Sequence, residues 1–333
     1  MLIARDYARI ATQTLTGWWN IKAPRLGAAL AYYTILSLAP LIVLATPLVS
    51  LAFRDPQQVQ GGIVSQFEAL VGKEGAVAVK SILSARPNFP PTRLTTYFGI
   101  GILVFAATGV FAELQDALNT VWGVVPAPGG FGKHAILSFL QQRFVSFAMV
   151  LGICFLLTVS LILSAGLTVA QQLIDERFHT LAMTWTIAHN VISVILITLL
   201  FAMMFKILPD AKVPWRDVWV GALLTSLLFT AGKWVIGLYL GNASIGRAYG
   251  GAGSIVVLLV WVYYSAQLVF LGAEFTHQYS KVRGSRVVPA DHAVAVTAEA
   301  RAQQGIPKPE QVKAAVELTK KVDPARDEDL PKS

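Results

Sequence analysis

The segment from Leu26 to Phe53 contains no charged side chain, and it constrains the fold more than any other part of the sequence. About 20 apolar residues in a helix cross the roughly 30 Å hydrocarbon core of a bilayer, so this segment is long enough to span a membrane. In the whole chain 14% of residues are charged and 55% are hydrophobic, whereas a soluble domain has about 25% charged residues. Such a chain cannot cover its apolar surface with polar groups. This excludes an ordinary soluble globule and favours lipid as the solvent.

Six windows of the sequence have the length and composition of a transmembrane helix. They lie at about 26–52, 94–112, 144–170, 185–208, 217–240 and 254–275. Pro40 and Pro47 should kink or interrupt the first window. The predicted fold class is therefore an all-α, polytopic membrane protein with six transmembrane helices.

Three further segments complete the predicted organisation. Residues 1–25 have apolar positions at helical spacing and predict an amphipathic helix, lying on the membrane or packed on the bundle. Residues 55–90 mix apolar with polar positions, which is typical of amphipathic helices and predicts a helical segment on the periplasmic face. Residues 281–333 contain ten basic and eight acidic side chains and no aromatic residue, so we expect a mostly disordered cytoplasmic tail.

The distribution of Lys and Arg predicts the orientation. With the N-terminus inside, the cytoplasmic flanks hold Arg5, Arg9, Lys22, Arg25, Lys133, Arg143, Lys206, Lys212, Arg216, Lys281, Arg283 and Arg286. The two short outer loops hold only Arg177 and Arg247. Basic residues collect at the cytoplasmic side of membranes, so we expect both termini in the cytoplasm. The net charge of +8 then lies mostly at membrane boundaries, which indicates membrane lipids and not nucleic acid as partners.

Lys233 is the one basic residue placed well inside a predicted span. An ionisable side chain at membrane depth is a functional hypothesis by default. Ser226 and Thr230 precede it at helical spacing and share its face. Lys233 could extend to the outer head groups, bond backbone carbonyls or meet an anionic ligand in a polar cavity. The last alternative makes these three residues candidates for a substrate path.

Polar residues on other spans extend this candidate path. His189 and Ser193 lie in the fourth window, and Tyr264 and Gln267 lie in the sixth. They could line a wet interior with Lys233, or they could hold helices together without any transport role. Arg247 lies in a glycine-rich stretch between the fifth and sixth windows. That stretch could cradle an anionic head group or could form a tight turn.

Three acidic residues lie near the predicted cytoplasmic boundary. Glu113 ends the second window, Asp116 follows it by three residues, and Glu274 ends the sixth window. These acids could gate a path at its cytoplasmic end or relay protons, or they could form a solvated face. Gly123 and Pro126 should end the helix that carries the first two.

Several long motifs resemble the YihY/virulence factor BrkB family of bacterial inner-membrane proteins, which older usage labels ribonuclease BN. They are ALAYYTILSLAPL at 29–41, TGVFAELQDALNTVW at 108–122, VPWRDVWVGALL at 213–224, GKWVIGLYLG at 232–241, and YGGAGSIVVLLVWVYYSAQLVFLGAEFT at 249–276. The resemblance covers about residues 15–280. It implies a polytopic fold in the inner membrane and a role in the cell envelope, with export or flipping of lipids or other amphipathic molecules as one suggestion.

The residues do not support the nuclease label. Hydrolytic nucleases need clustered metal-binding carboxylates or histidines, or an acid–base pair in a water-accessible groove. The five histidines are isolated in the sequence, and Cys154 is the single cysteine. We therefore expect no enzyme activity, no catalytic residue, no cofactor, no metal and no nucleic-acid partner.

Two functions from different classes remain. One is transport or transbilayer movement of an amphipathic, anionic substrate along the polar faces of the fourth to sixth spans. The other is a non-transporting envelope scaffold or interaction protein. A central cavity lined by Lys233, Tyr264 and Gln267 would favour transport, and a dry, tightly packed centre would favour the scaffold.

Overall fold

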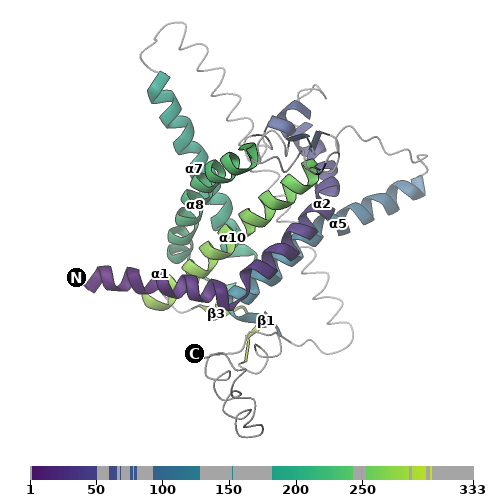
Figure 1. Cartoon of the computed structure of the whole chain (residues 1–333). Coiled ribbons are helices and arrows are strands. Elements are labelled where there is room, and N and C mark those ends of the chain that lie inside the picture. The colour runs from purple at the N-terminus through teal and green to yellow at the C-terminus, as the bar shows by residue number, and fades with distance from the viewer. Residues whose placement is uncertain are drawn as a thin grey trace, which may run out of the picture.

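The computed structural model of the chain is mostly helical (Figure 1). It describes residues 2–50, 60–65, 68, 76–77, 79–80, 93–127, 152, 182–242, 249, 253–284, 287–297 and 301. Its long helices are α1 (Leu2–Asn20), α2 (Ala23–Ser50), α5 (Arg93–Trp122), α7 (Ala182–Ile207), α8 (Trp215–Asn242) and α10 (Gly253–Val282). Its short strands are β1 (Val124–Pro126), β2 (Ala211–Lys212), β3 (Val288–Pro289) and β4 (Ala293–Ala295).

Helix α10 is the centre of the bundle. It packs against α1, α2, α5 and α8, while α2 also packs against α5, and α7 packs against α8. Figure 1 shows α10 crossing the middle of the molecule, with α1 and the labelled strands at one end of it. The apolar core follows these contacts and includes Phe205, Leu118 and Phe270, none of which is exposed to solvent.

Three of the six predicted windows lie within α5, α8 and α10, and two more overlap α2 and α7 but extend one or two residues past their ends. The window at 144–170 falls outside the described residues apart from residue 152. Within the described part, the segments Trp215–Ile236 and Ile255–Val282 are long and apolar enough to cross a membrane. Helix α2 runs without a break past Pro40 and Pro47, so the expected alternative of an interruption is wrong. Six spans remain a prediction.

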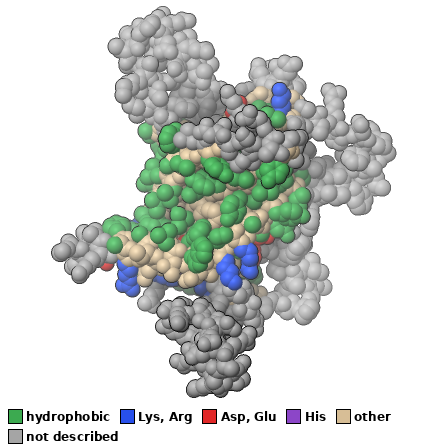
Figure 2. Space-filling model, in the orientation of Figure 1, with side chains coloured by type: hydrophobic (Ala, Val, Ile, Leu, Met, Phe, Trp, Pro, Cys, Tyr) green, Lys and Arg blue, Asp and Glu red, His purple; other side chains and the backbone are tan. Residues whose placement is uncertain are grey.

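The surface of the bundle carries an apolar band. Figure 2 shows hydrophobic side chains across the middle of the molecule, with Lys and Arg below them. Large exposed apolar side chains include Leu36 on α2, Ile195 on α7 and Leu227 on α8. Exposed aromatic residues on α8 include Trp215, Trp219, Trp234 and Tyr239. Trp219 and Tyr239 are 20 residues apart, or about 30 Å along a helix, which is comparable to the thickness of a hydrocarbon core. Aromatic residues are enriched at the borders of such a core.

One end of the bundle, here named the basic end, carries most of the described cations. It is formed by the first turns of α2 and α8, the last turns of α5, α7 and α10, and the strands. Its basic residues are Lys22, Arg25, Lys206, Lys212, Arg216, Lys281, Arg283 and Arg301. By the rule that cations collect on the inner side, this end is expected to face the cytoplasm.

Helix α1 is packed on the bundle at the basic end. Gly17 lies so close to α10 that a Cβ atom added to it would be 2.0 Å from Oε1 of Glu274. Arg283 Nη2 lies 3.3 Å from Oδ2 of Asp6, and Ile10 is fully buried. Packing on the bundle is one of the two arrangements expected for this amphipathic helix, and its contact with the membrane surface stays a prediction.

Two short antiparallel ladders tie the C-terminal segment to the basic end. Strand β1 pairs with β4, with Val124 opposite Ala295, and β2 pairs with β3, with Ala211 opposite Pro289. Residues 287–297 therefore depart from the disordered tail expected for 281–333, and the all-α description omits these strands. The run of valines in this stretch favours extended structure, and loops ending α5 and α7 supply the strands that pair with it. Beyond residue 297 only Arg301 is described, so disorder there stays a prediction.

The segment expected to form amphipathic helices is helical where it is described, at 60–65, 68, 76–77 and 79–80. Ile63, Ala76 and Val79 are buried, whereas Gln60 and Lys80 are exposed. These residues have the mixture of buried and exposed positions expected of an amphipathic helix, and the amphipathic segment as a whole stays a prediction. Their location on the periplasmic face remains a prediction.

Candidate functional site

The polar face of α8 makes hydrogen bonds within the bundle. Ser226, which is fully buried, shares a hydrogen bond with Thr198 on α7, with 2.7 Å between the two hydroxyl oxygens. The hydroxyl of Thr230 donates to the carbonyl oxygen of Ser226 at 2.8 Å. These two candidate path residues therefore join α7 to α8 or bond their own helix.

Lys233 is half-buried in α8, inside the apolar band. The described residues give it neither an ion pair nor a hydrogen bond. The hydroxyl of Tyr264 lies against Gly232, at 2.7 Å from where a Cβ atom would stand. The structure thus places Tyr264 beside the turn of α8 that carries Lys233.

Gln267 lies in a different interface, between α10 and the start of α2. Its Nε2 donates to the carbonyl oxygen of Ala23 at 3.4 Å and lies close against Gly27. Its Oε1 is buried and has no hydrogen-bond partner among the described residues. Ser193 is half-buried on α7, only the helical backbone of His189 is described, and Arg247 lies outside the described residues.

Aromatic side chains fill the interface of α7, α8 and α10. The rings of Phe201 and Phe229 have centroids 5.7 Å apart, and those of Phe229 and Trp261 are 5.9 Å apart, both edge to face. Phe205 stacks on Phe201 from the next turn of α7. Phe201, Phe205 and Phe229 belong to the buried apolar core, and Trp261 packs against it.

Glu274 is buried at the basic end, with 2% of its surface exposed. Its Oε1 accepts a hydrogen bond from Gln278 at 2.6 Å, and its Oε2 lies 3.8 Å from Nδ1 of His277. Neither of those last two atoms has a hydrogen-bond partner among the described residues. The ring of His277 lies 5.2 Å from that of Trp122, so this acid is enclosed where α1, α5 and α10 meet.

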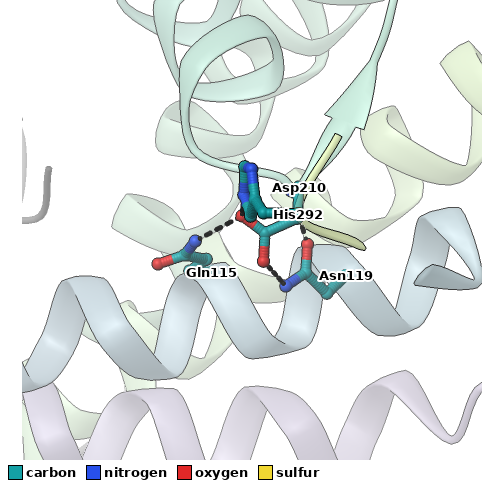
Figure 3. A network of polar contacts seen from close by, with 4 residues as sticks. All are labelled: Gln115, Asn119, Asp210 and His292. Atoms are coloured by element: carbon teal, nitrogen blue, oxygen red, sulfur yellow. Dashed lines mark hydrogen bonds and ion pairs between the residues drawn. The ribbon is translucent and has the colours of Figure 1, made fainter. Parts of the chain in front are cut away.

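A second buried acid, Asp210, is the centre of a network that the sequence did not reveal (Figure 3). Asp210 lies between α7 and β2 and is 7% exposed. Gln115 donates to its Oδ1 at 3.0 Å, and Asn119 donates to its Oδ2 at 2.8 Å and accepts its backbone N–H at 2.8 Å. His292 Nε2 also lies 3.0 Å from Oδ1 and acts as a donor, because a carboxylate can only accept. The network joins α5, the α7–α8 connection and the C-terminal segment.

A sequence signal for this network existed on one side only. Gln115 and Asn119 are one helical turn apart, next to the buried Leu114 and Leu118. Buried amides require hydrogen-bond partners, so this pattern indicates that a polar residue from another part of the chain packs against them. The distance along the chain to Asp210 is about 90 residues, and no periodicity points to it.

A third buried carboxylate, Asp217, lies in the first turn of α8. Ser280 on α10 donates to its Oδ2 at 2.8 Å, and Gly284 lies against the same group. The positive end of the α8 dipole favours an anion at this position. The basic end therefore buries three carboxylates, each on a different contact between elements.

A pocket of about 150 Å³ lies beside the Asp210 network. Its lining comprises Ile21, Arg25, Leu26, Asp116, Asn119, Thr120, Val124, Val125, Val296 and Arg301. Asn119 belongs to both the network and the pocket. Asp116, a predicted gate acid, is exposed in this lining, whereas Glu113 is half-buried on the same helix and does not line the pocket.

The acidic and histidine side chains of the described residues are spread over several contacts between elements. Within these residues, no three His, Cys, Asp or Glu side chains gather closely enough to hold a metal ion. His292 and His277, isolated in the sequence, each lie near a buried carboxylate. The strongest constellation for a ligand is the pocket with two arginines at the basic end.

The apolar helices and the exposed apolar band are consistent with a helical membrane protein. The chain belongs to the virulence factor BrkB family, whose profile matches residues 14–296. The family resemblance expected from the motifs is thereby confirmed.

Curated relatives are described as UPF0761 membrane proteins. The relative from Azotobacter vinelandii is 26% identical over 272 residues, which are 80% of this chain and 62% of the relative. The one from Tolumonas auensis is 24% identical over 262 residues, covering 78% of this chain and 81% of the relative. The one from Rhodospirillum centenum is 24% identical, covering 85% and 60%. The chain thus spans about three-fifths of the length of the first of these relatives and of the third. No solved structure matches it.

Proposed function

We propose that this protein moves an anionic amphiphile, such as an envelope lipid, between the leaflets of a bacterial inner membrane. The observation that carries this proposal is Lys233, a half-buried cation in the apolar band for which the described residues provide no counter-charge. A charge at membrane depth costs several kcal/mol unless it is paired or hydrated. An anionic head group passing the turn of α8 that holds Lys233 and faces Tyr264 would provide that pairing.

The depth of Lys233 suits this role. It lies 14 residues beyond Trp219, or about 21 Å along α8, and six residues before Tyr239, or about 9 Å. Lys233 is therefore within reach of the head groups at the end opposite the basic end. The buried acids Asp210, Asp217 and Glu274 lie at the other end of the same bundle. A route from Lys233 to these acids would therefore cross the apolar band.

A second function, a non-transporting envelope scaffold, also has an observation in its favour. The Thr198–Ser226 hydrogen bond and the edge-to-face contacts of Phe229 close the interface of α7, α8 and α10. Small polar side chains commonly hold membrane helices together. On this proposal Ser226 and Thr230 stabilise the bundle, and Lys233 extends to the head groups without a ligand.

Reconstitution into liposomes with a fluorescent-lipid scrambling assay distinguishes the two proposals. The comparison is between wild type, Lys233→Met and Lys233→Arg, with Lys22→Met as a control that removes one exposed cation at the basic end. Transport predicts scrambling by wild type, a several-fold loss in Lys233→Met, recovery in Lys233→Arg and little change in the control. Failure of wild type with phospholipids and lipid A-like substrates would reject transport and leave the scaffold.

A further inference from the structure

We infer that the pocket at the basic end binds the phosphate group of an anionic lipid, held between the guanidinium groups of Arg25 and Arg301. Both arginines line the same cavity of about 150 Å³. Arginine matches the geometry of phosphate because its planar fork donates two parallel hydrogen bonds. The inference concerns binding, and it does not depend on whether the protein transports lipid.

The fold brings the two arginines together from opposite ends of the sequence. Arg25 lies in the first turn of α2, and its backbone N–H donates to the carbonyl oxygen of Lys22 at 2.8 Å. Arg301 follows β4, which pairs with β1 directly after α5. The N–H of Arg301 donates to the carbonyl oxygen of Thr297 at 3.0 Å, which ties Arg301 to the segment that follows β4.

Gly123 positions Arg301. It ends α5 with a φ of +66°, a conformation that favours glycine. A Cβ atom added here would be 2.1 Å from Nη2 of Arg301, so the guanidinium lies directly on the backbone of this turn. The carbonyl oxygen of Gly123 also accepts the N–H of Val296 at 2.9 Å. The C-terminal segment is thus held on the end of α5 before the point where the arginine enters the pocket.

The charge of the lining favours an anion. Among the described residues neither Arg25 nor Arg301 forms an ion pair, and the lining holds one carboxylate, that of the exposed Asp116. The amide of Asn119 and the hydroxyl of Thr120 already donate to Asp210 and to the α5 backbone. The two guanidinium groups are the cationic donors of this lining, and the positive end of the long helix α2 adds to their field.

The position of the pocket favours a lipid over a soluble phosphate. Arg25 comes seven residues, or about 10 Å, before the exposed Tyr32 at which α2 enters the apolar band. Trp19, which is 69% exposed, lies just before α2, where interfacial aromatic residues are found. Basic pockets at the inner ends of membrane helices bind anionic head groups. The cavity also has about ten times the volume that one water molecule needs, which leaves room for a phosphate.

The test measures dissociation constants of the full-length protein in detergent by native mass spectrometry. The probes are dioctanoyl phosphatidylglycerol and dioctanoyl phosphatidic acid, with dioctanoyl phosphatidylcholine as a lipid without net charge and inorganic phosphate as a soluble competitor. The variants are Arg25→Gln, Arg301→Gln and Asp116→Asn. Arg216→Gln serves as the matched control, because Arg216 is an exposed arginine of the basic end outside the pocket.

We expect Arg25→Gln and Arg301→Gln each to weaken binding of the anionic lipids at least tenfold, and Arg216→Gln to change it less than twofold. Asp116→Asn removes a negative charge from the lining and should tighten binding. Unchanged circular dichroism and melting temperature in each variant establish that the fold is retained.

Wild-type affinity in both pocket variants would overturn the site, because the two arginines would then contribute nothing to lipid binding. An equal loss of affinity in Arg216→Gln would also overturn it, because the loss would then reflect general surface charge. Competition by inorganic phosphate at concentrations similar to those of the lipids would overturn the lipid assignment and identify a soluble phosphate as the ligand. A negative scrambling assay with intact lipid binding would reject transport alone.

Discussion

Asn119 on α5 holds Asp210 by two hydrogen bonds, both at 2.8 Å. The side-chain N–H of Asn119 donates to Oδ2 of Asp210, and the backbone N–H of Asp210 donates to Oδ1 of Asn119. The amide therefore satisfies a buried carboxylate and the backbone of the α7–α8 connection at once. A buried acid of this kind depends on its donors, since its charge has lost most of its hydration. The pair fixes the end of α7 to α5.

Asn119→Ala is expected to destabilise the protein by about 2–4 kcal/mol, the sum of one hydrogen bond to a charged group and one to a neutral group. The midpoint of thermal unfolding in detergent should fall by several degrees. Thr120→Ala on the same helix is the control, because the hydroxyl of Thr120 bonds only the carbonyl oxygen of Asp116 within α5. Equal melting temperatures for the two variants would show that the network contributes no stability.

The close approach of α1 to α10 at Gly17 gives a second prediction. Gly17→Ala places a methyl group where Oε1 of Glu274 now lies, so α1 must move or the acid must leave its buried position. We expect faster amide hydrogen exchange over 6–20 and a lower melting temperature. Gly61→Ala is the matched control, because a Cβ atom at Gly61 meets nothing within 4 Å and alanine favours the helix. Equal protection of the α1 amides from hydrogen exchange in both variants would show that Gly17 does not contact Glu274 in this way.

The sequence predicted the parts of the fold that depend on local composition. Apolar windows in the sequence placed α2, α5, α7, α8 and α10. The position of Gly123 at the end of α5 also followed from its conformational freedom.

The sequence did not predict what depends on contacts between distant segments. Strands of two or three residues, such as β2 and β3, have too little periodicity to recognise. Arg25 and Arg301 meet only because β4 pairs with β1, and Asp210 is recognisable as buried only once Asn119 is placed beside it. The predicted substrate path also depends on such contacts. Ser226 and Gln267 both lie on polar faces, but Ser226 contacts Thr198 on α7 and Gln267 contacts the start of α2, so they do not line one path.

The Thr198–Ser226 hydrogen bond predicts a coupling energy between α7 and α8. A double-mutant cycle with Thr198→Val and Ser226→Ala should give a coupling of about 0.6 kcal/mol, and at most about 1.7, the range found for such bonds in membranes. Each single variant leaves one buried hydroxyl without its interhelical partner, so the double variant should be more stable than the sum of single effects predicts. The readout is unfolding in detergent or bicelles. Strictly additive effects would show that the two hydroxyls do not interact.

The last prediction concerns pH and the pairing of Lys212 with Asp291, which links β2 to the turn between β3 and β4. The hydrogen bond from Lys212, at 2.5 Å, and its positive charge lower the pKa of Asp291 below the ordinary value of about 3.9. Because the folded pKa lies below the unfolded one, the stabilisation is fully present above about pH 4 and disappears as the pH falls through the lowered pKa. Both side chains are exposed, so the effect should be small. We expect Lys212→Met to melt slightly below wild type at pH 6 and to converge with it in strong acid. A difference that persists unchanged to the lowest pH would mean that Lys212 stabilises the ladder without using the charge of Asp291.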